Sequence, residues 1–276
     1  MKLITINTHS LVEEHYSEKL DTFVSAIAEI QPEIIALQEV NQTASESEIS
    51  EAESEGLVKV GVVPVKRDNH VYNAVKMLRE MGVNYYWTWL GMKLGYDKYD
   101  EGIALMSRSP ILEAKVITIS KIDDYGNWKT RKIVGVRTEA HPKEWFFSVH
   151  LGWWNDETEP FQNQWKRTLE SLPDSGNIWL MGDFNSPAEV RSEGYDMMLK
   201  DGFCDSFTLA ENRDSGVTVG KVIDGWREKI NSTDGMRIDL ILSREKRNVR
   251  SSQVIFGGEN KAVISDHYGV LIEVKE

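Results

Sequence analysis

The segment WLMGDFNSP (179–187) places a carboxylate and a carboxamide, Asp183 and Asn185, two residues apart at the end of an apolar run. Side chains two positions apart on an extended chain point to the same face, so both could act on one reacting centre. A carboxylate can accept a proton from water, and a carboxamide can donate a hydrogen bond, which are functions needed for hydrolysis. Taken alone, these residues also suit a tight turn.

Other polar side chains stand within or just after apolar runs along the chain. They are Asn7 after LITI, Glu39 in IIALQEV, His150 in FFSVHL, Asp239 in RIDLIL, and Asp266 and His267 in SDHYG. These groups offer oxygen and imidazole atoms, and no serine or cysteine nucleophile signature accompanies them. Carboxylate and carboxamide oxygens suit Mg²⁺ or Mn²⁺ better than zinc. We therefore expect a Mg²⁺ or Mn²⁺ site and water as the nucleophile.

The elements that must position these residues are mostly strands. Apolar runs typical of strands occur at 3–7, 33–40, 84–90, 102–107, 115–120, 132–138, 145–151, 177–183, 237–243, 252–257 and 268–274. Helical spacing of apolar residues occurs at 17–32, 68–82, 159–172 and 194–202. No repeat or linker divides the chain, so we expect a single catalytic domain over 1–276. More strands than helices favours two packed sheets flanked by helices.

Composition narrows the class of partner. The 276 residues carry a net charge of −12, which repels a long polyanion and makes nucleic acid an unlikely partner. Cys204 is the only cysteine, which excludes an internal disulfide framework. No apolar run approaches the roughly 20 residues of a membrane span, and the first residues lack a signal-peptide pattern. We expect a cytoplasmic protein with no membrane partner.

The polar residues and their surroundings, in this chain order, resemble the endonuclease/exonuclease/phosphatase superfamily. The matching segments are LQEV around Glu39, EGIALMSR around Glu101, SVHL around His150, GDFN around Asp183, RIDLIL around Asp239 and the final SDHYG. The resemblance implies an α/β fold, a four-layered α/β sandwich of two mostly antiparallel sheets flanked by helices. It also implies Mg²⁺-dependent hydrolysis of phosphate esters, and it leaves the substrate open.

The resemblance assigns roles around the attacking water and the metal. Asp183 would orient the water and accept its proton, and Asn185 would donate to that water or to a phosphate oxygen. Glu39 would be the main metal ligand, with Asn7 and Asp266 completing the set.

It also assigns the groups that face the phosphate. His267, held by Asp239, would be the imidazolium that stabilises charge on the phosphoryl oxygens. His150 would be a second histidine there, oriented by Glu101. Arg131 would clamp a phosphate oxygen, although an arginine on a sheet face explains it nearly as well.

Aromatic residues favour a small phosphorylated sugar as the substrate. Trp153, Trp154 and Trp226 follow or flank the predicted site residues, and flat rings stack on sugar rings and also on bases. Segments such as HLGWWNDETEPF resemble a bacterial branch of the family that acts on maltose 6'-phosphate. A DNA nuclease or 3'-phosphatase with the same catalytic set is the alternative. It should add a basic groove, whereas the basic residues here are scattered.

Overall fold

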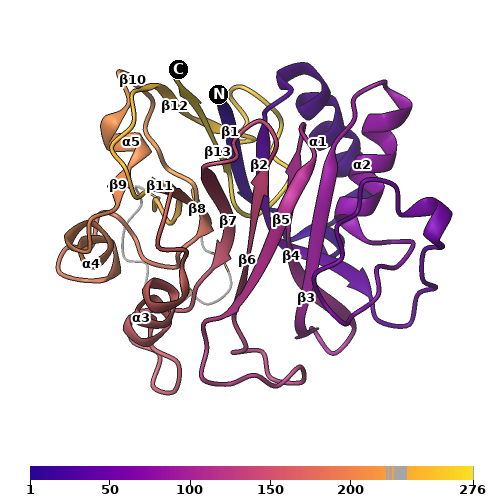
Figure 1. Ribbon diagram of the computed structural model, residues 1–276, viewed down its shortest axis with the longest axis horizontal. Helices are drawn as coiled ribbons and strands as arrows, with labels where there is room; N and C mark the ends of the chain where they lie inside the picture. Colours follow the sequence, from indigo (N-terminus) through magenta and orange to yellow (C-terminus); the bar gives the residue numbers. More distant parts are fainter. Residues whose placement is uncertain (222, 224–225, 227–234, 276) are drawn as a thin grey trace.

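The strands form two sheets that pack face to face in the computed structural model, which describes residues 1–221, 223, 226 and 235–275 (Figure 1). The first sheet has the order β10-β12-β13-β1-β2-β4-β3. Its strands are β1 (Lys2–Asn7), β2 (Ile34–Thr43), β3 (Tyr86–Gly95), β4 (Tyr99–Ser107), β10 (Asn212–Arg213), β12 (Val249–Ile255) and β13 (Gly269–Val274).

The second sheet has the order β5-β6-β7-β8-β11-β9. Its strands are β5 (Ile111–Thr118), β6 (Lys132–Thr138), β7 (Glu144–His150), β8 (Asn177–Asp183), β9 (Cys204–Asp205) and β11 (Asp239–Ser243). The parallel pairs among the described strands are β1 with β2, β7 with β8, and β10 with β12, and the other pairs are antiparallel. Every predicted strand overlaps an observed one, and only the two-residue β9 and β10 have no counterpart in the prediction.

Helices cover the outer face of each sheet. They are α1 (Tyr16–Ile30), α2 (His70–Glu80), α3 (Phe161–Ser171) and α4 (Gly194–Lys200). The short helix α5 (Ser206–Leu209) instead contacts β11 and β12, one strand of each sheet, and short 3-10 turns occur at η1 (Ser10–Val12) and η2 (Glu51–Glu53). Apolar residues of α1 and α2 pack against β1 and β2, and those of α3 and α4 pack against β7 and β8. The result is a helix–sheet–sheet–helix arrangement, so the predicted four-layered sandwich is confirmed.

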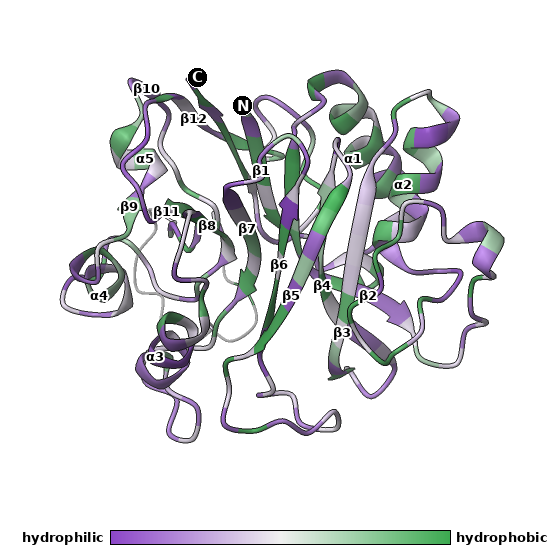
Figure 2. Ribbon diagram, in the orientation of Figure 1, coloured by the Kyte–Doolittle hydropathy of each residue, from purple (hydrophilic) through white to green (hydrophobic). Residues whose placement is uncertain are grey.

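Alternation along the strands fills the space between the sheets. In β1, Ile4 and Ile6 face the helices, whereas Leu3 joins the apolar cluster between the sheets with Phe146 and Trp179. This is the period of two expected of a strand that is buried on both faces. Figure 2 shows the apolar residues concentrated on the central strands.

Strand direction brings the polar strand ends together. Because β7 and β8 are parallel and in register, His150 lies opposite Asp183. Because β11 runs antiparallel to β8, Asp239 also pairs with Asp183. In the other sheet, the parallel pair β1 and β2 places Asn7 beside Gln38, the neighbour of Glu39. One edge of the sandwich therefore collects the predicted site residues.

Candidate active site

A cavity of about 450 Å³ opens at this edge of the sandwich. The predicted site residues that line it are Glu39, Glu101, Arg131, His150, Trp153, Asp183, Asn185, Asp266 and His267. Other described residues on its wall include His9, Lys93, Tyr96 and Trp128. The tertiary structure thus joins residues from both sheets in one enclosure.

Glu39 reaches the cavity because β2 is irregular at this point. The pairing of β2 with β4 shifts between Leu37 and Val40, and Glu39 has a φ of 48°. A bulge turns a side chain away from its regular direction and is common beside active sites. Asn7 Nδ2 donates to Glu39 Oε1 at 2.9 Å. Burial, and next the charge of Glu101, raise the pKa of Glu39, and the positive charge of His9 opposes this shift.

Asp183 lies at the centre of the polar groups and is 1% exposed. Its Oδ1 accepts from the Asn185 backbone N at 2.8 Å, and its Oδ2 accepts from Asn7 Nδ2 at 3.3 Å. The Nε2 atoms of His150 and His267 lie 3.6 and 3.9 Å from Oδ2. Burial raises the pKa of Asp183 to about 7, despite the opposing charge of His267. A carboxylate with that pKa can exchange a proton with water near neutral pH.

His267 is held as a cation by Asp239. Its Nδ1 lies 2.9 Å from Asp239 Oδ2, and Asp239 is fully buried. Burial opposes the charge on the ring, but the hydrogen bond to Asp239 and the negative charges of Asp239, Asp183 and Asp266 together outweigh it, and the pKa of His267 is raised to about 10. The remaining nitrogen, Nε2, faces Asp183, so the imidazolium presents positive charge at the cavity.

His150 differs from His267 in charge and in partners. Burial, and next the charges of Arg131 and Lys93, hold the pKa of His150 well below its usual value, so the ring is neutral. Among the described residues, Nδ1 has no hydrogen-bond partner. The expectation that Glu101 orients His150 is corrected: Glu101 Oε1 pairs with Lys93 Nζ at 3.0 Å. The register of β3 with β4 puts Lys93 directly opposite Glu101.

Two cations share the wall of the cavity with these histidines. Arg131 is 3% exposed and donates through Nη1 to Trp128 O at 2.9 Å, while Lys93 Nζ donates to the same carbonyl at 2.9 Å. Within the described part of the chain, Arg131 Nε has no hydrogen-bond partner. A buried guanidinium with an unused donor is suited to bind an anion.

The tryptophans predicted to bind substrate fall into two groups. Trp153 lines the cavity, as does Trp128. Trp154 is absent from the described lining and packs on Phe161 with ring centroids 6.2 Å apart, so its prediction is corrected to a packing role. Trp226 is buried and donates through Nε1 to Asn185 Oδ1 at 3.0 Å. Trp226 therefore holds a site residue and does not line the cavity itself.

Both the oxygen and the nitrogen of the Asn185 carboxamide form hydrogen bonds within the protein. Besides the bond from Trp226, its Nδ2 donates to Leu151 O at 2.9 Å and lies 3.4 Å from Asp183 Oδ2. Its φ of 46° lies in the left-handed region. Such strain in non-glycine residues gathers at functional sites, where surrounding contacts maintain it.

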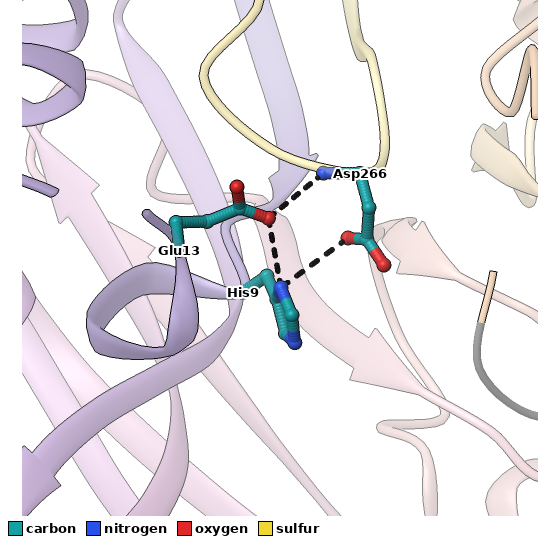
Figure 3. A group of neighbouring side chains, drawn as sticks. All are labelled: His9, Glu13 and Asp266. Atoms are coloured by element: carbon teal, nitrogen blue, oxygen red, sulfur yellow. Dashed lines mark hydrogen bonds and ion pairs between the residues drawn. The ribbon is translucent and has the colours of Figure 1, made fainter. Parts of the chain in front are cut away.

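His9 and Glu13 are site residues that the sequence analysis missed (Figure 3). His9 Nδ1 lies 2.7 Å from Glu13 Oε1 and 3.8 Å from Asp266 Oδ1, and Glu13 Oε1 accepts from the Asp266 backbone N at 3.1 Å. His9 Nε2 lies 3.1 Å from Tyr96 Oη. A usable signal was present, because His9 follows Asn7 by two residues just as Asn185 follows Asp183.

The donor set of the cavity fits a divalent cation. Glu39 and Asp266 line the same enclosure as Glu101, and the mutual repulsion of these carboxylates contributes to the raised pKa of Glu39. Asn7 adds a carboxamide in contact with Glu39. His9, Glu13 and Asp266 also form an acidic and histidine group that could bind a metal ion. Oxygen-rich donors of this kind select hard cations.

Comparison with known proteins identifies the family of the chain. The model of the Endonuclease/Exonuclease/phosphatase family matches residues 4–267. The chain belongs to this family. Members of the family are hydrolases that act on phosphoesters, so this protein is a phosphoester hydrolase. No curated protein matches the chain in sequence.

Solved structures of the endonuclease/exonuclease/phosphatase family show the same fold. A family protein from Leptotrichia buccalis is similar at 30% identity with a TM-score of 0.88, and the match covers 100% of both chains. A mannosyl-6-phosphatase from Bacteroides thetaiotaomicron has 17% identity and a TM-score of 0.67, again over 100% of both. A Neisseria 3' phosphatase bound to a product DNA hairpin has 18% identity and a TM-score of 0.63 over 100% of both. Family membership therefore leaves the choice between sugar and DNA substrates open.

Not one of the described helices has the length and apolar character that crossing a bilayer requires.

Proposed function

We propose that this protein is a Mg²⁺-dependent phosphomonoesterase that releases phosphate from a small phosphorylated sugar, with maltose 6'-phosphate as the candidate substrate. The observation that carries the proposal is one cavity of about 450 Å³ that combines Asp183, the His267 imidazolium, Arg131 and two tryptophans. Its size lies in the range of roughly 300–1,000 Å³ that is usual for small-molecule sites.

The residues of the cavity supply what hydrolysis of a phosphate ester needs. Asp183 takes a proton from the attacking water, whose oxygen forms the new bond to phosphorus. The bond from phosphorus to the sugar oxygen breaks, and that oxygen leaves with the electron pair and takes up a proton from solvent, while Asp183 releases the proton that it accepted. His267, Arg131 and Lys93 offset the negative charge on the phosphoryl oxygens.

A divalent cation would be held by Glu39, Asn7 and Asp266, with Mg²⁺ preferred and Mn²⁺ able to replace it. When bound, the cation neutralises phosphate charge and stabilises the departing oxygen. Asn7 also donates to Asp183, so one side chain connects the metal ligands to the proton acceptor. His9 and Glu13 hold Asp266 in place through its backbone N and its carboxylate.

Charge and shape support a sugar phosphate over a long nucleic acid. The net charge of −12 opposes approach of a polyanion. Trp128 and Trp153 offer flat apolar surfaces to the C–H face of a sugar ring. The mannosyl-6-phosphatase that shares the fold supports the class, and the loop segments around Trp153 that resemble enzymes acting on maltose 6'-phosphate support the individual sugar. A cytoplasmic location accords with the single cysteine.

A DNA 3'-phosphatase or nuclease is the second candidate function. The observation in its favour is the Neisseria 3' phosphatase, which has the same fold with a DNA hairpin bound. The same catalytic residues would serve both reactions, because the bond that breaks is a phosphate ester in each.

Phosphate release with Mg²⁺ and with EDTA separates these candidates. The substrates are maltose 6'-phosphate, glucose 6-phosphate and a nicked plasmid that carries 3'-phosphates. We expect preferential release from the disaccharide and loss of activity with EDTA. Activity confined to the plasmid would reject the sugar assignment and keep the catalytic residues. Full activity in EDTA would reject the metal.

A further inference from the structure

Two loops build the aromatic wall of the cavity. Residues 119–131 join β5 to β6 and carry Trp128, and residues 151–160 join β7 to α3 and carry Trp153. The two rings have centroids 6.0 Å apart and planes inclined at 60°, so they meet as a corner. Trp128 is 53% exposed, and both rings line the cavity. The corner is therefore open to a ligand. Its two rings, Trp128 and Trp153, belong to different loops.

Lys129 and Asp156 join these loops next to the corner. Lys129 Nζ lies 2.9 Å from Asp156 Oδ1 and donates to Thr158 Oγ1 at 2.7 Å. The same Nζ lies 5.2 Å from the centroid of the Trp128 ring. The Asp156 backbone N donates to Trp153 O at 3.4 Å. A continuous set of contacts thus runs from Trp128 through Lys129 and Asp156 to Trp153.

Asp156 is itself held in one position. Its Oδ1 accepts from the backbone N atoms of Thr158 and Glu159 at 2.9 and 2.8 Å. The side chains of Lys129 and Asp156 are 21% and 11% exposed, so solvent screens this pair less than a fully exposed one. An ion pair with one fixed and partly buried partner can define a distance between loops.

Each loop has further anchors away from the corner. Glu159 Oε1 accepts from Ile122 N at 2.7 Å, a second bridge between the loops. Tyr125 Oη donates to Asp100 Oδ1 at 2.7 Å, which fastens the first loop to β4. These contacts preserve the loops if the ion pair is removed, so its loss changes mainly the local placement of Trp128 relative to Trp153.

We propose that Lys129 and Asp156 are positioning residues that set the Trp128–Trp153 corner to receive the ring of the leaving group. The enzyme would then select phosphate esters whose leaving group extends beyond the atoms next to phosphorus. The receiving surface is apolar and aromatic, so the matching group is the C–H face of a sugar ring. This inference rests on the proposed function and adds how the enzyme would select a sugar phosphate over a smaller phosphate ester.

The test compares two substrates across matched variants. Maltose 6'-phosphate has sugar rings that the proposed corner would receive, whereas glycerol 3-phosphate contains the ester without a ring. The variants are Asp156→Asn, which keeps the acceptor for the two backbone N atoms, and Lys129→Met, with Lys129→Arg as the variant that retains charge. Asp123→Asn is the control, because Asp123 lies in the same loop as Lys129, pairs with Lys132 at the start of β6 at 2.7 Å and is absent from the described cavity lining.

We expect Asp156→Asn and Lys129→Met to raise KM for maltose 6'-phosphate about fivefold with little change in kcat, as loss of a well-placed aromatic contact would. Glycerol 3-phosphate kinetics should stay unchanged in both variants. Lys129→Arg should restore KM, and Asp123→Asn should match the wild type. Melting temperatures establish that each variant is folded.

Two results would overturn the inference and keep the proposed function. One is a wild type that prefers maltose 6'-phosphate while both variants retain that preference in full. The other is an equal loss on both substrates, which indicates general damage to the site. A wild type with equal kcat/KM for the two esters would overturn both the inference and the sugar-phosphate proposal.

Discussion

Nδ1 of His267 lies 2.9 Å from Oδ2 of Asp239, and both side chains are buried beside Asp183. The contact assigns the two ring nitrogens different tasks, because Nδ1 is occupied and Nε2 faces the cavity. It also supplies the charge that keeps the ring protonated at neutral pH. In the proposed function, this ion pair would place the positive charge of His267 where it can offset phosphoryl charge.

Replacing Asp239 with asparagine should lower kcat roughly 10²- to 10⁴-fold, since the ring loses the charge that favours its imidazolium form. Phosphate release from maltose 6'-phosphate measures the effect. Asp21→Asn on the exposed side of α1 is the matched control and should behave as the wild type. An Asp239→Asn enzyme within a few-fold of wild-type kcat would exclude charge on His267 as a requirement.

Asp183→Asn should also lower kcat by roughly 10²- to 10⁴-fold, because a carboxamide cannot take the proton of the attacking water. The carboxamide oxygen can still accept from Asn185 N, so folding should be retained. The acceptor for Asn7 Nδ2 is lost, but Asn7 keeps its bond to Glu39 Oε1, so Mg²⁺ affinity should be retained as well. Calorimetric titration with Mg²⁺ checks the second point. Turnover near that of the wild type would show that another group accepts the proton.

Glu39→Gln should raise the Mg²⁺ concentration needed for half-maximal activity by roughly tenfold or more, since it removes the charge of the main ligand. Binding of Mg²⁺ without substrate should weaken in parallel. Glu80→Gln, at the exposed end of α2, serves as the control. An unchanged Mg²⁺ titration would contradict the assignment of Glu39 as a ligand.

Trp226→Phe should lower kcat about fivefold and leave KM unchanged, which corresponds to the loss of one hydrogen bond of about 1 kcal/mol. The reason is that Trp226 Nε1 holds Asn185 Oδ1, and Asn185 in turn holds Asp183. Steady-state kinetics on maltose 6'-phosphate separates the two constants. A rise in KM alone would instead indicate direct contact with substrate.

The buried side chain of His70 should lower the free energy of unfolding in acid, and this effect is independent of catalysis. Its ring packs between Tyr16 and Phe23, and burial lowers its pKa to about 4. Because the unfolded chain binds this proton near pH 6.5 and the folded chain only near 4, the free energy of unfolding falls as pH drops through that window. The loss should approach about 3 kcal/mol below pH 4. No such loss arises above pH 6.5, where both states are neutral.

Urea unfolding at pH 7 and pH 5 measures this effect for the wild type and for His70→Phe. The variant should lose less stability between the two pH values than the wild type does. His15→Phe is a control for a histidine that is exposed at the start of α1. Equal pH dependence of wild type and His70→Phe would contradict the buried neutral state of His70.

The sequence alone predicted the strands, two packed sheets flanked by helices, and most of the polar residues that line the cavity. These features depend on local patterns, because alternation marks a buried strand and a polar residue at its end stands out against the apolar run. Asp183, Asp239, His150 and His267 were recognisable in this way. His9 could have been recognised too, since it repeats the spacing of Asn185 from Asp183.

Only the tertiary structure decided which of these residues meet and what each one does. The parallel pairing of β7 with β8 places His150 opposite Asp183. The register of β3 with β4 places Lys93 opposite Glu101, and the two side chains form an ion pair. Trp153 and Trp154 are adjacent in sequence, yet one lines the cavity and the other packs on Phe161. Contacts between residues far apart in sequence follow from how strands pair and loops cross, which local residue patterns do not encode.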